Sequence, residues 1–192
     1  MNSIAQINTT TVNGVDVHRL QQTIHAIRDN AGLAKFQFTL ANQWLGGARN
    51  RSTVRAFFGA GQQHTHARAF QLEADEPAVL LGEDSAAGAG ELLLHALAAC
   101  VTGTIAYHAA ARGIRIERIE SSVEGDVDLR GFLGLDNRVR NGFQQIRMKF
   151  RIKADVPEAE LQALCNLGPQ FSPIFDSITR GLPVLVSSES LK

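Results

Sequence analysis

The stretch that decides the fold is Glu91-Leu-Leu-Leu-His-Ala-Leu-Ala-Ala-Cys-Val-Thr-Gly-Thr-Ile-Ala-Tyr-His-Ala-Ala-Ala-Arg112, which Gly113 follows. It is nearly free of charge and rich in alanine. A glycine directly after such a run is a common helix stop. The stretch therefore predicts one long helix from about Glu91 to Arg112. A helix that is apolar on every side is typical of a protein core, so we expect other elements to cover it.

The same stretch is about as long as a membrane-spanning helix. Its composition argues against that role, because it is dominated by alanine rather than leucine-like bulk, and it carries His95 and His108. The N-terminal residues Met1 to Thr11 have neither the basic nor the apolar region of a secretory signal. We therefore expect a cytoplasmic protein with no membrane partner.

Composition sets further bounds. The 192 residues, 44% of them hydrophobic, are enough to bury the core of one globular unit. Lysine plus arginine and aspartate plus glutamate number 19 each, so no overall field attracts nucleic acid. The two cysteines make no disulfide scaffold.

Hydrophobic periodicity predicts the elements around the long helix. Before it, an amphipathic helix precedes an antiparallel meander whose first turn is Gly46-Gly47. After it, two alternating strands pair across a charged loop. Two short helices follow. Gly168-Pro169 is expected to break or kink the first, and Ser172-Pro173 begins the second as N-cap and first helical residue. The predicted ranges are helices 16–29, 91–112, 157–166 and 172–179, strands 35–44, 53–58, 68–73, 114–127, 146–152 and 182–186, and the loop 128–142.

Gly82-Glu83-Asp84 together with the Cys100 helix resembles the signature of the OsmC/Ohr family, the osmotically inducible and organic hydroperoxide resistance proteins. In that family an acidic, glycine-bearing loop leads into a central helix with the peroxidatic cysteine. The order of elements agrees over essentially the whole chain, and both Asn13 to Gln43 and Phe132 to Asp136 resemble a longer OsmC-like subgroup.

The resemblance implies an α+β fold of two layers, with antiparallel sheets wrapped around the long central helix. It also implies an intertwined homodimer whose sites lie at the interface. Residues 1–192 would form a single OsmC-like domain, with residues 1–34 as an N-terminal helical extension.

The resemblance also assigns site residues. In active members, one cysteine attacks an organic hydroperoxide, an arginine and a glutamate hold its thiolate, and a second cysteine resolves the sulfenic acid. Cys100 matches the first cysteine, and Ser172 stands where the second is expected, so the intramolecular disulfide cannot form. For the arginine, Arg49 in the first hairpin is our first choice and Arg51 the second. Glu91 is the candidate glutamate, nine residues before the cysteine rather than ten.

Each candidate has a plainer interpretation. A mid-helix cysteine such as Cys100 is often an inert, buried thiol. Arg49 and Arg51 could be ordinary solvated charges. An offset of nine residues puts Glu91 on the helix face opposite Cys100, so it could instead be a first-turn acid on the helix dipole. Cys165 could conceivably replace the resolving cysteine, although an ordinary core or surface thiol is the simpler interpretation.

No metal or cofactor is expected. His95 and His108 are thirteen residues apart, and His64 and His66 form a lone pair, whereas a closed zinc site needs four ligands. The resemblance likewise implies no cofactor.

Two hypotheses of function follow. The first is a stress-response hydroperoxide reductase in which Cys100 attacks a small hydrophobic peroxide and an external thiol reductant resolves the product. The second is a non-catalytic OsmC-like protein that binds a small hydrophobic ligand at the dimer interface, with Cys100 kept for packing.

Overall fold

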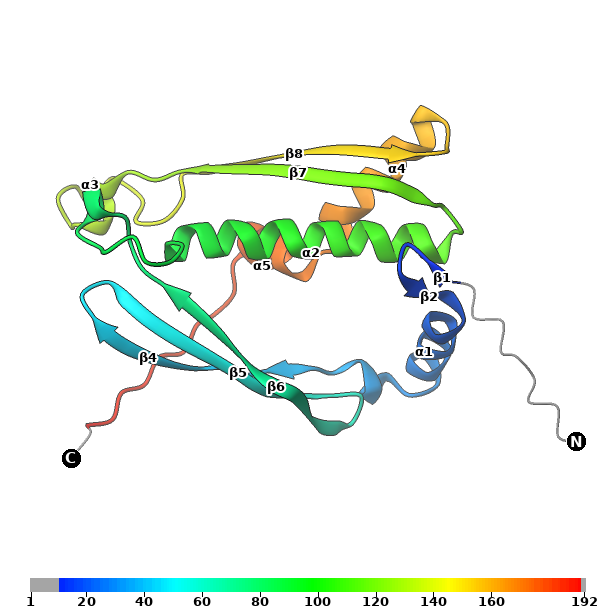
Figure 1. Cartoon of the computed structure of the whole chain (residues 1–192), viewed down its shortest axis with the longest axis horizontal. Coiled ribbons are helices and arrows are strands. Elements are labelled where there is room, and N and C mark those ends of the chain that lie inside the picture. The colour runs from blue at the N-terminus through cyan, green and yellow to red at the C-terminus, as the bar shows by residue number, and fades with distance from the viewer. Residues whose placement is uncertain (1–10, 191–192) are drawn as a thin grey trace, which may run out of the picture. The chain divides into compact units, whose positions relative to one another are not determined.

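The computed structural model describes residues 11–190 and is a mixed α+β structure with antiparallel sheets and one long helix (Figure 1). This is the predicted fold class. The chain divides into two compact units, residues 1–95 and 96–192, which are described separately. The elements are β1 (Thr11–Val12), β2 (Val15–Asp16), α1 (Val17–Asp29), η1 (Ala31–Ala34), β3 (Gln37–Phe38), β4 (Ala41–Gly46), β5 (Arg49–Gly59), β6 (Gln62–Ala74), η2 (Ala78–Leu80), α2 (Ala89–Ala111), β7 (Ile116–Asp126), α3 (Leu129–Phe132), β8 (Gln145–Ala154), α4 (Glu158–Phe171) and α5 (Pro173–Arg180).

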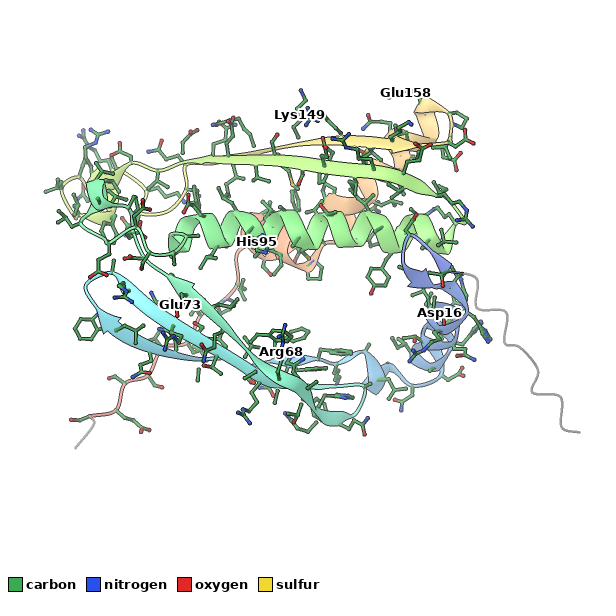
Figure 2. All side chains as sticks on the ribbon, viewed as in Figure 1. Asp16, Arg68, Glu73, His95, Lys149 and Glu158 are labelled. Atoms are coloured by element: carbon green, nitrogen blue, oxygen red, sulfur yellow. The ribbon has the colours of Figure 1, made fainter. Side chains whose placement is uncertain are left out.

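In the first unit the predicted amphipathic helix follows the short β1–β2 hairpin. Asp16, labelled in Figure 2, is the N-cap of α1, and its carboxylate accepts a hydrogen bond from the Arg19 N–H at 3.0 Å. Asn30 ends the helix, as predicted. Most of Met1 to Thr11, the stretch without the regions of a secretory signal, lies outside the described residues. The helices α1 and η1 lie within the predicted N-terminal extension.

The four-stranded sheet of the first unit is organised around β5. Strand β6 pairs with one side of β5, and the short β3 and β4 pair with the other. The predicted hairpin is confirmed, with Gly47-Ala48 as its two turn residues after Gly46 ends β4, and Gly46 and Gly47 have positive φ values of 114° and 55°. The prediction of one continuous strand over residues 35–44 is wrong. Residues 39 and 40 are not in a strand, so they separate β3 from β4.

A second tight turn was not predicted. Ala60 and Gly61 join β5 to β6 with φ values of 49° and 79°, the left-handed conformations of a two-residue hairpin turn. Gly59-Ala-Gly61 therefore serves as the turn of this hairpin. Strand β6 is longer than the strand predicted over residues 68–73.

The second unit packs one stripe of α2 against a hairpin. Leu97, Val101, Ile105 and Ala109 recur at spacings of four and are buried with Ile114 and Leu164. In Figure 1 the paired strands β7 and β8 run along α2. Every second side chain of β8 packs against the stripe: Ile146, Met148, Phe150, Ile152 and Ala154. The predicted pairing of these two strands is confirmed, as is the helix stop at Gly113, whose φ is 71°.

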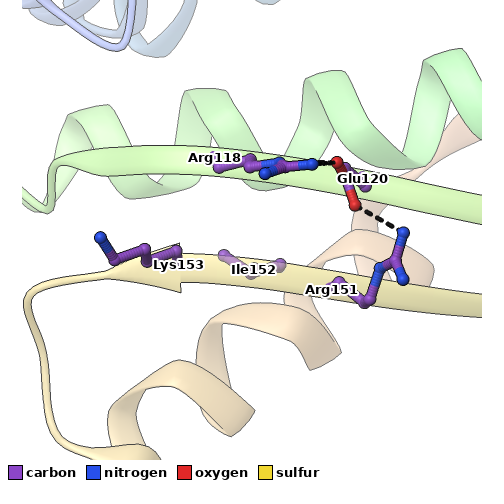
Figure 3. A pocket seen from close by; sticks show the side chains of 5 residues that line it. All are labelled: Arg118, Glu120, Arg151, Ile152 and Lys153. Carbon is purple, nitrogen blue, oxygen red and sulfur yellow. Dashed lines mark hydrogen bonds and ion pairs between the residues drawn. The ribbon is translucent and has the colours of Figure 1, made fainter.

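The opposite face of this hairpin is charged. Figure 3 shows Glu120 on β7 forming ion pairs with Arg118 on the same strand and with Arg151, its cross-strand partner on β8. Lys149 likewise points away from α2 in Figure 2. Exposed ion pairs of this kind contribute little stability, on the order of 0–1 kcal/mol each. They mark a solvated face, as the strict alternation of polar and apolar residues in β8 predicts.

The structure corrects two predictions near the C-terminus. Helix α4 does not end at Asn166 but continues through Pro169 to Phe171. Its buried Gly168 packs directly on Val101 and Ile105, and this packing outweighs the backbone bond that proline removes. Residues 182–186 form no strand within the described part of the chain, because no neighbouring strand pairs with them.

By length and hydropathy alone, α2 is able to cross a membrane: it has 23 residues and a mean hydropathy of 1.5. Core helices of soluble proteins pass the same test. Within the second unit one stripe of α2, from Leu97 to Ala109, is buried and packs against β8, whereas most of the helix surface is not buried in the single chain.

Candidate functional site

Cys100 is a half-buried thiol in the middle of α2. Its neighbours Leu97 and Val101 are buried in the core of the second unit, whereas Ala99 is exposed. The backbone carbonyl of Cys100 accepts a hydrogen bond from the Thr104 hydroxyl at 2.8 Å. Cys100 therefore lies at the margin of the buried stripe, between the buried Val101 and the exposed Ala99.

Arg49 forms an ion pair that the sequence did not predict. It begins β5, directly after the first hairpin turn, and its Nη1 donates to Glu83 Oε2 at 3.0 Å. Glu83 belongs to the acidic, glycine-bearing loop before α2. Together the hairpin and this loop line a hollow of about 260 Å³ in the first unit. The structure thus brings together the candidate arginine and an acid of the loop that carries the family resemblance.

Arg51, the second candidate, is bound elsewhere. Its Nε donates to Glu73 Oε1 at 2.8 Å, and the two residues are direct cross-strand partners in β5 and β6. Glu73 is labelled in Figure 2. This is an ordinary ladder ion pair on a sheet. Its distance and the exposure of its arginine are similar to those of the Arg49–Glu83 pair, although Glu73 is less exposed than Glu83. Arg51 and Glu73 therefore form a matched control for Arg49 and Glu83.

Asp75 organises the loop that holds Glu83, and the sequence did not single it out. Its side chain is only 1% exposed and accepts hydrogen bonds from the N–H groups of Glu76, Glu83 and Ser85 and from the Ser85 hydroxyl, at 2.7–3.1 Å. Bonds from the backbone and side chain of Ser85, followed by those from Glu76 and Glu83, outweigh burial and lower the pKa of Asp75 to about 2.

We expect Asp75→Asn to lower the thermal midpoint at neutral pH by roughly 3–5 °C, because an amide cannot accept all of these bonds. Since the pKa of Asp75 in the folded protein is below its usual value, this stabilisation is present above about pH 4 and is lost as the pH falls towards 2. Thermal melts between pH 6 and 2 should show a shallower acid decline in the variant. The exposed Asp155→Asn is the control, and identical acid profiles for wild type and Asp75→Asn would contradict this role for Asp75.

Glu91 caps its own helix. It lies in the first turn of α2, and its Oε2 accepts a hydrogen bond from the Gly88 N–H at 2.8 Å. This is half of a capping box, in which an early glutamate reaches back to the residue before the helix. The plainer interpretation of Glu91 as a first-turn acid therefore describes its contacts in the structure.

Ser172 is the N-cap of α5, as predicted. Its side chain is 1% exposed, its hydroxyl accepts a hydrogen bond from the Phe175 N–H at 3.2 Å, and Pro173 follows at the start of the helix. Its own N–H donates to the Gly168 carbonyl at 2.9 Å, which joins α4 to α5. The hydroxyl thus stabilises the structure at the position where the family's resolving thiol is expected.

We expect Ser172→Ala to reduce the free energy of unfolding by about 1 kcal/mol, because the Phe175 N–H loses its cap. Urea unfolding followed by circular dichroism measures this. Ser177→Ala is the matched control: Ser177 bonds the Pro173 carbonyl from within the same helix, and alanine favours a helix interior. Equal losses for the two variants would contradict the capping role of Ser172.

The remaining candidates lie apart from this chemistry. The ring of His108 stacks on Phe171 with centroids 4.7 Å apart, and burial followed by the charge of Arg112 lowers the pKa of His108. His64 and His66 pack against Phe57. Within residues 11–190, no group of three histidine, cysteine or acidic side chains is placed to hold a metal. Burial, followed by Glu158, raises the pKa of Cys165.

The predicted site residues fall in both units. Arg49, Arg51 and Glu91 belong to residues 1–95, and Cys100 and Ser172 to residues 96–192. Sequence reasoning missed Glu83 as the partner of Arg49 because their contact joins positions 34 residues apart, across the whole meander. For Asp75 the only signal was its place in Ala-Asp-Glu-Pro, directly after a strand.

Comparisons with solved structures agree with the fold described above. An OsmC-like protein of Mycoplasma pneumoniae is 18% identical with a TM-score of 0.58, over 76% of this chain and 89% of that chain. An OsmC-like protein of Vibrio cholerae is 11% identical with a TM-score of 0.53, over 74% and 94%. An organic hydroperoxide resistance protein OsmC of Legionella pneumophila is 18% identical with a TM-score of 0.51, over 74% and 90%. At these identities the likeness shows a shared fold.

No curated protein sequence matches the chain significantly. The family model of OsmC-like proteins, however, matches residues 82–187, from the acidic loop through the Cys100 helix to the extended C-terminal segment. This match covers more than half of the chain and contains both Cys100 and Ser172. The chain therefore belongs to the family of OsmC-like proteins.

Proposed function

We propose that this protein is a cytoplasmic, thiol-dependent organic hydroperoxide reductase that acts in stress defence, with Cys100 as the attacking residue. The observation that carries the proposal is the half-buried position of Cys100 on the central helix of the region that matches the OsmC-like family model. The name of the Legionella structure, an organic hydroperoxide resistance protein, supports the substrate class.

In the proposed reaction, the Cys100 thiolate attacks the terminal oxygen of the hydroperoxide. An S–O bond forms, the O–O bond breaks, and the departing alkoxide takes up a proton to leave as an alcohol. The cysteine is thereby oxidised to a sulfenic acid. An external thiol then displaces water from the sulfenic acid to give a mixed disulfide, and a second thiol releases reduced Cys100 together with an external disulfide.

The Arg49–Glu83 pair is the arginine and carboxylate that we propose for this site, with Glu83 in place of Glu91. A guanidinium favours a thiolate over a thiol and also stabilises the developing charge on the peroxide oxygens. The carboxylate of Glu83 holds one end of the guanidinium at 3.0 Å and so restricts its orientation. Glu91 is left to cap its own helix.

The state of Ser172 supports an external reductant. Its hydroxyl is buried and engaged with the Phe175 N–H, and a hydroxyl cannot condense with a sulfenic acid to form a disulfide. The proposed partners are therefore a small hydrophobic peroxide and a small or protein dithiol. Neither nucleic acid nor membrane is needed.

We also propose a homodimer. Large apolar side chains stay exposed in the single chain, including Phe38 and Trp44 on the sheet of the first unit. In the unpaired C-terminal segment, Val184, Leu185 and Val186 are 77–97% exposed. Exposed apolar residues in a strand-like segment favour pairing with another chain. Light scattering on purified protein is expected to give twice the chain mass, and a monomer would contradict this proposal.

The test of the main proposal is the site of oxidation. Purified protein is treated with cumene hydroperoxide, and sulfenic acid is trapped with dimedone in wild type, Cys100→Ser and Cys165→Ser. We expect trapping in wild type and Cys165→Ser and none in Cys100→Ser. A Cys100 that stays reduced in a large excess of peroxide would refute the reductase.

That outcome would favour the second function, binding of a small hydrophobic ligand at the dimer interface without catalysis. Two observations favour it: Ser172 and Glu91, at two of the family's functional positions, are engaged in capping helices. Cys100 would then be a packing residue of the interface.

A further inference from the structure

A cavity of about 340 Å³ lies within the second unit, away from the residues of the proposed reaction. Three elements, β8, α4 and α5, supply its walls, and Leu97 of α2 is the only lining residue of the central helix. The lining residues are Leu97, Ile146, Met148, Phe150, Cys165, Asn166, Pro169, Phe175, Ile178 and Thr179. Cys100 is not among them.

Sequence spacing explains why these side chains converge. Ile146, Met148 and Phe150 alternate along β8 and so share one face of the strand. Cys165 and Pro169 are four residues apart in α4, and Phe175 and Ile178 are three apart in α5, so each pair lies on one helix face. The cavity is therefore built from the facing surfaces of regular elements rather than from loops.

The lining of the cavity is largely apolar. Eight of the ten residues are hydrocarbon or sulfur, and none carries a charge. The two polar residues, Asn166 and Thr179, are exposed and mark the mouth. The Thr179 hydroxyl already donates to the Phe175 carbonyl at 2.8 Å, and the Asn166 side-chain oxygen accepts from Gln162 at 3.3 Å. The raised pKa of the Cys165 thiol fits the same apolar surroundings.

We propose that this cavity is a binding site for an uncharged, largely hydrocarbon small molecule, whose apolar part contacts Met148, Phe175 and Cys165. The volume falls within the range of small-molecule sites, roughly 300–1,000 Å³. A carboxylate or ammonium group would be desolvated there without an ionic partner, so charged ligands are disfavoured. The site is independent of Cys100 chemistry, and it stands whether or not the protein reduces peroxides.

The first test uses the neutral fluorophore N-phenyl-1-naphthylamine, whose emission rises in apolar surroundings, with the full chain carrying Cys100→Ser. We expect saturable binding that 1-octanol displaces and that octanoate, the charged analogue of the same length, displaces at least roughly ten-fold more weakly. Equal displacement by the alcohol and the carboxylate would overturn the proposed chemistry.

The second test locates the site. In the same Cys100→Ser background Cys165 is the only thiol, and saturating 1-octanol should slow its alkylation by N-ethylmaleimide roughly ten-fold. Cys165→Phe should abolish fluorophore binding by filling the cavity, whereas Ala163→Phe, on the exposed side of the same helix, should leave it unchanged.

Either of two results would refute the site: alkylation of Cys165 that 1-octanol does not slow, or fluorophore binding that survives Cys165→Phe in a folded variant. The first result would also be seen if a second copy of the chain filled the cavity. The alkylation test does not depend on the folding of Cys165→Phe, because it uses Cys165 itself.

Discussion

Replacing Arg49 by methionine is expected to slow the oxidation of Cys100 by cumene hydroperoxide roughly 100-fold, the usual effect of removing one donor from a site of developing negative charge. Methionine keeps most of the side-chain bulk and removes only the guanidinium. Arg49→Lys keeps the charge but loses the forked geometry, so its oxidation rate should fall between those of wild type and Arg49→Met. The measurement is the second-order rate of thiol loss under pseudo-first-order peroxide.

The matched control is Arg51→Met on the same strand, which breaks an ion pair of similar length and similar arginine exposure. We expect a change of less than about three-fold, because exposed pairs on a sheet contribute little. Glu83→Gln should give a smaller loss than Arg49→Met, and Glu73→Gln almost none. A larger loss in Arg51→Met than in Arg49→Met would transfer the proposed role to Arg51.

Substituting Gly168 is expected to give the largest loss of stability. A Cβ at this position would lie 2.7 Å from Val101 Cγ1 and 2.9 Å from Ile105 Cγ1, inside normal carbon contact distances. Overpacking should outweigh the helix propensity that alanine adds, so we expect Gly168→Ala to lose about 1–2 kcal/mol and Gly168→Val about 3 kcal/mol. Urea unfolding of each variant measures the loss.

Gly103→Ala is the control, because it is also a glycine inside a helix but has no heavy atom within 4 Å of the added Cβ. In the single chain we expect it to gain roughly 0.5–1 kcal/mol from helix propensity. A stabilised Gly168→Ala would mean that Val101 and Ile105 can move aside. A destabilised Gly103→Ala would indicate that another chain packs on that part of α2.

Local signals in the sequence predicted most of the elements. Gly113 ends α2 because only a residue tolerant of positive φ fits there, and Ser172-Pro173 begins α5 through a side-chain cap and a fixed proline φ. The alternation in β8 was predicted correctly, since one face packs on the core and the other meets water. These features depend on residues within one turn or one strand.

The predictions that were wrong concern features that depend on residues distant in sequence. Helix α4 was expected to end near Asn166, with a break or kink at Gly168-Pro169, but the packing of Gly168 on α2 keeps the helix continuous to Phe171. Residues 182–186 have the composition of a strand and no strand to pair with in the single chain. For the site, Cys100, Arg49 and Ser172 were identified by resemblance, and their chemical roles stay predictions. The contact between Arg49 and Glu83 joins segments that no local pattern connects.

The tight turns between β4 and β5 and between β5 and β6 also bear on how fast the protein folds. Because Gly47-Ala48 and Ala60-Gly61 each join adjacent strands, the β4–β5–β6 meander closes through loops of minimal length. Such contacts form in about 1–10 μs in isolated hairpins. In the second unit, β7 and β8 close a much longer loop, residues 127–144, whose entropy must be lost before the strands pair. The meander is therefore expected to be protected from hydrogen exchange first during refolding, and the β7–β8 hairpin later.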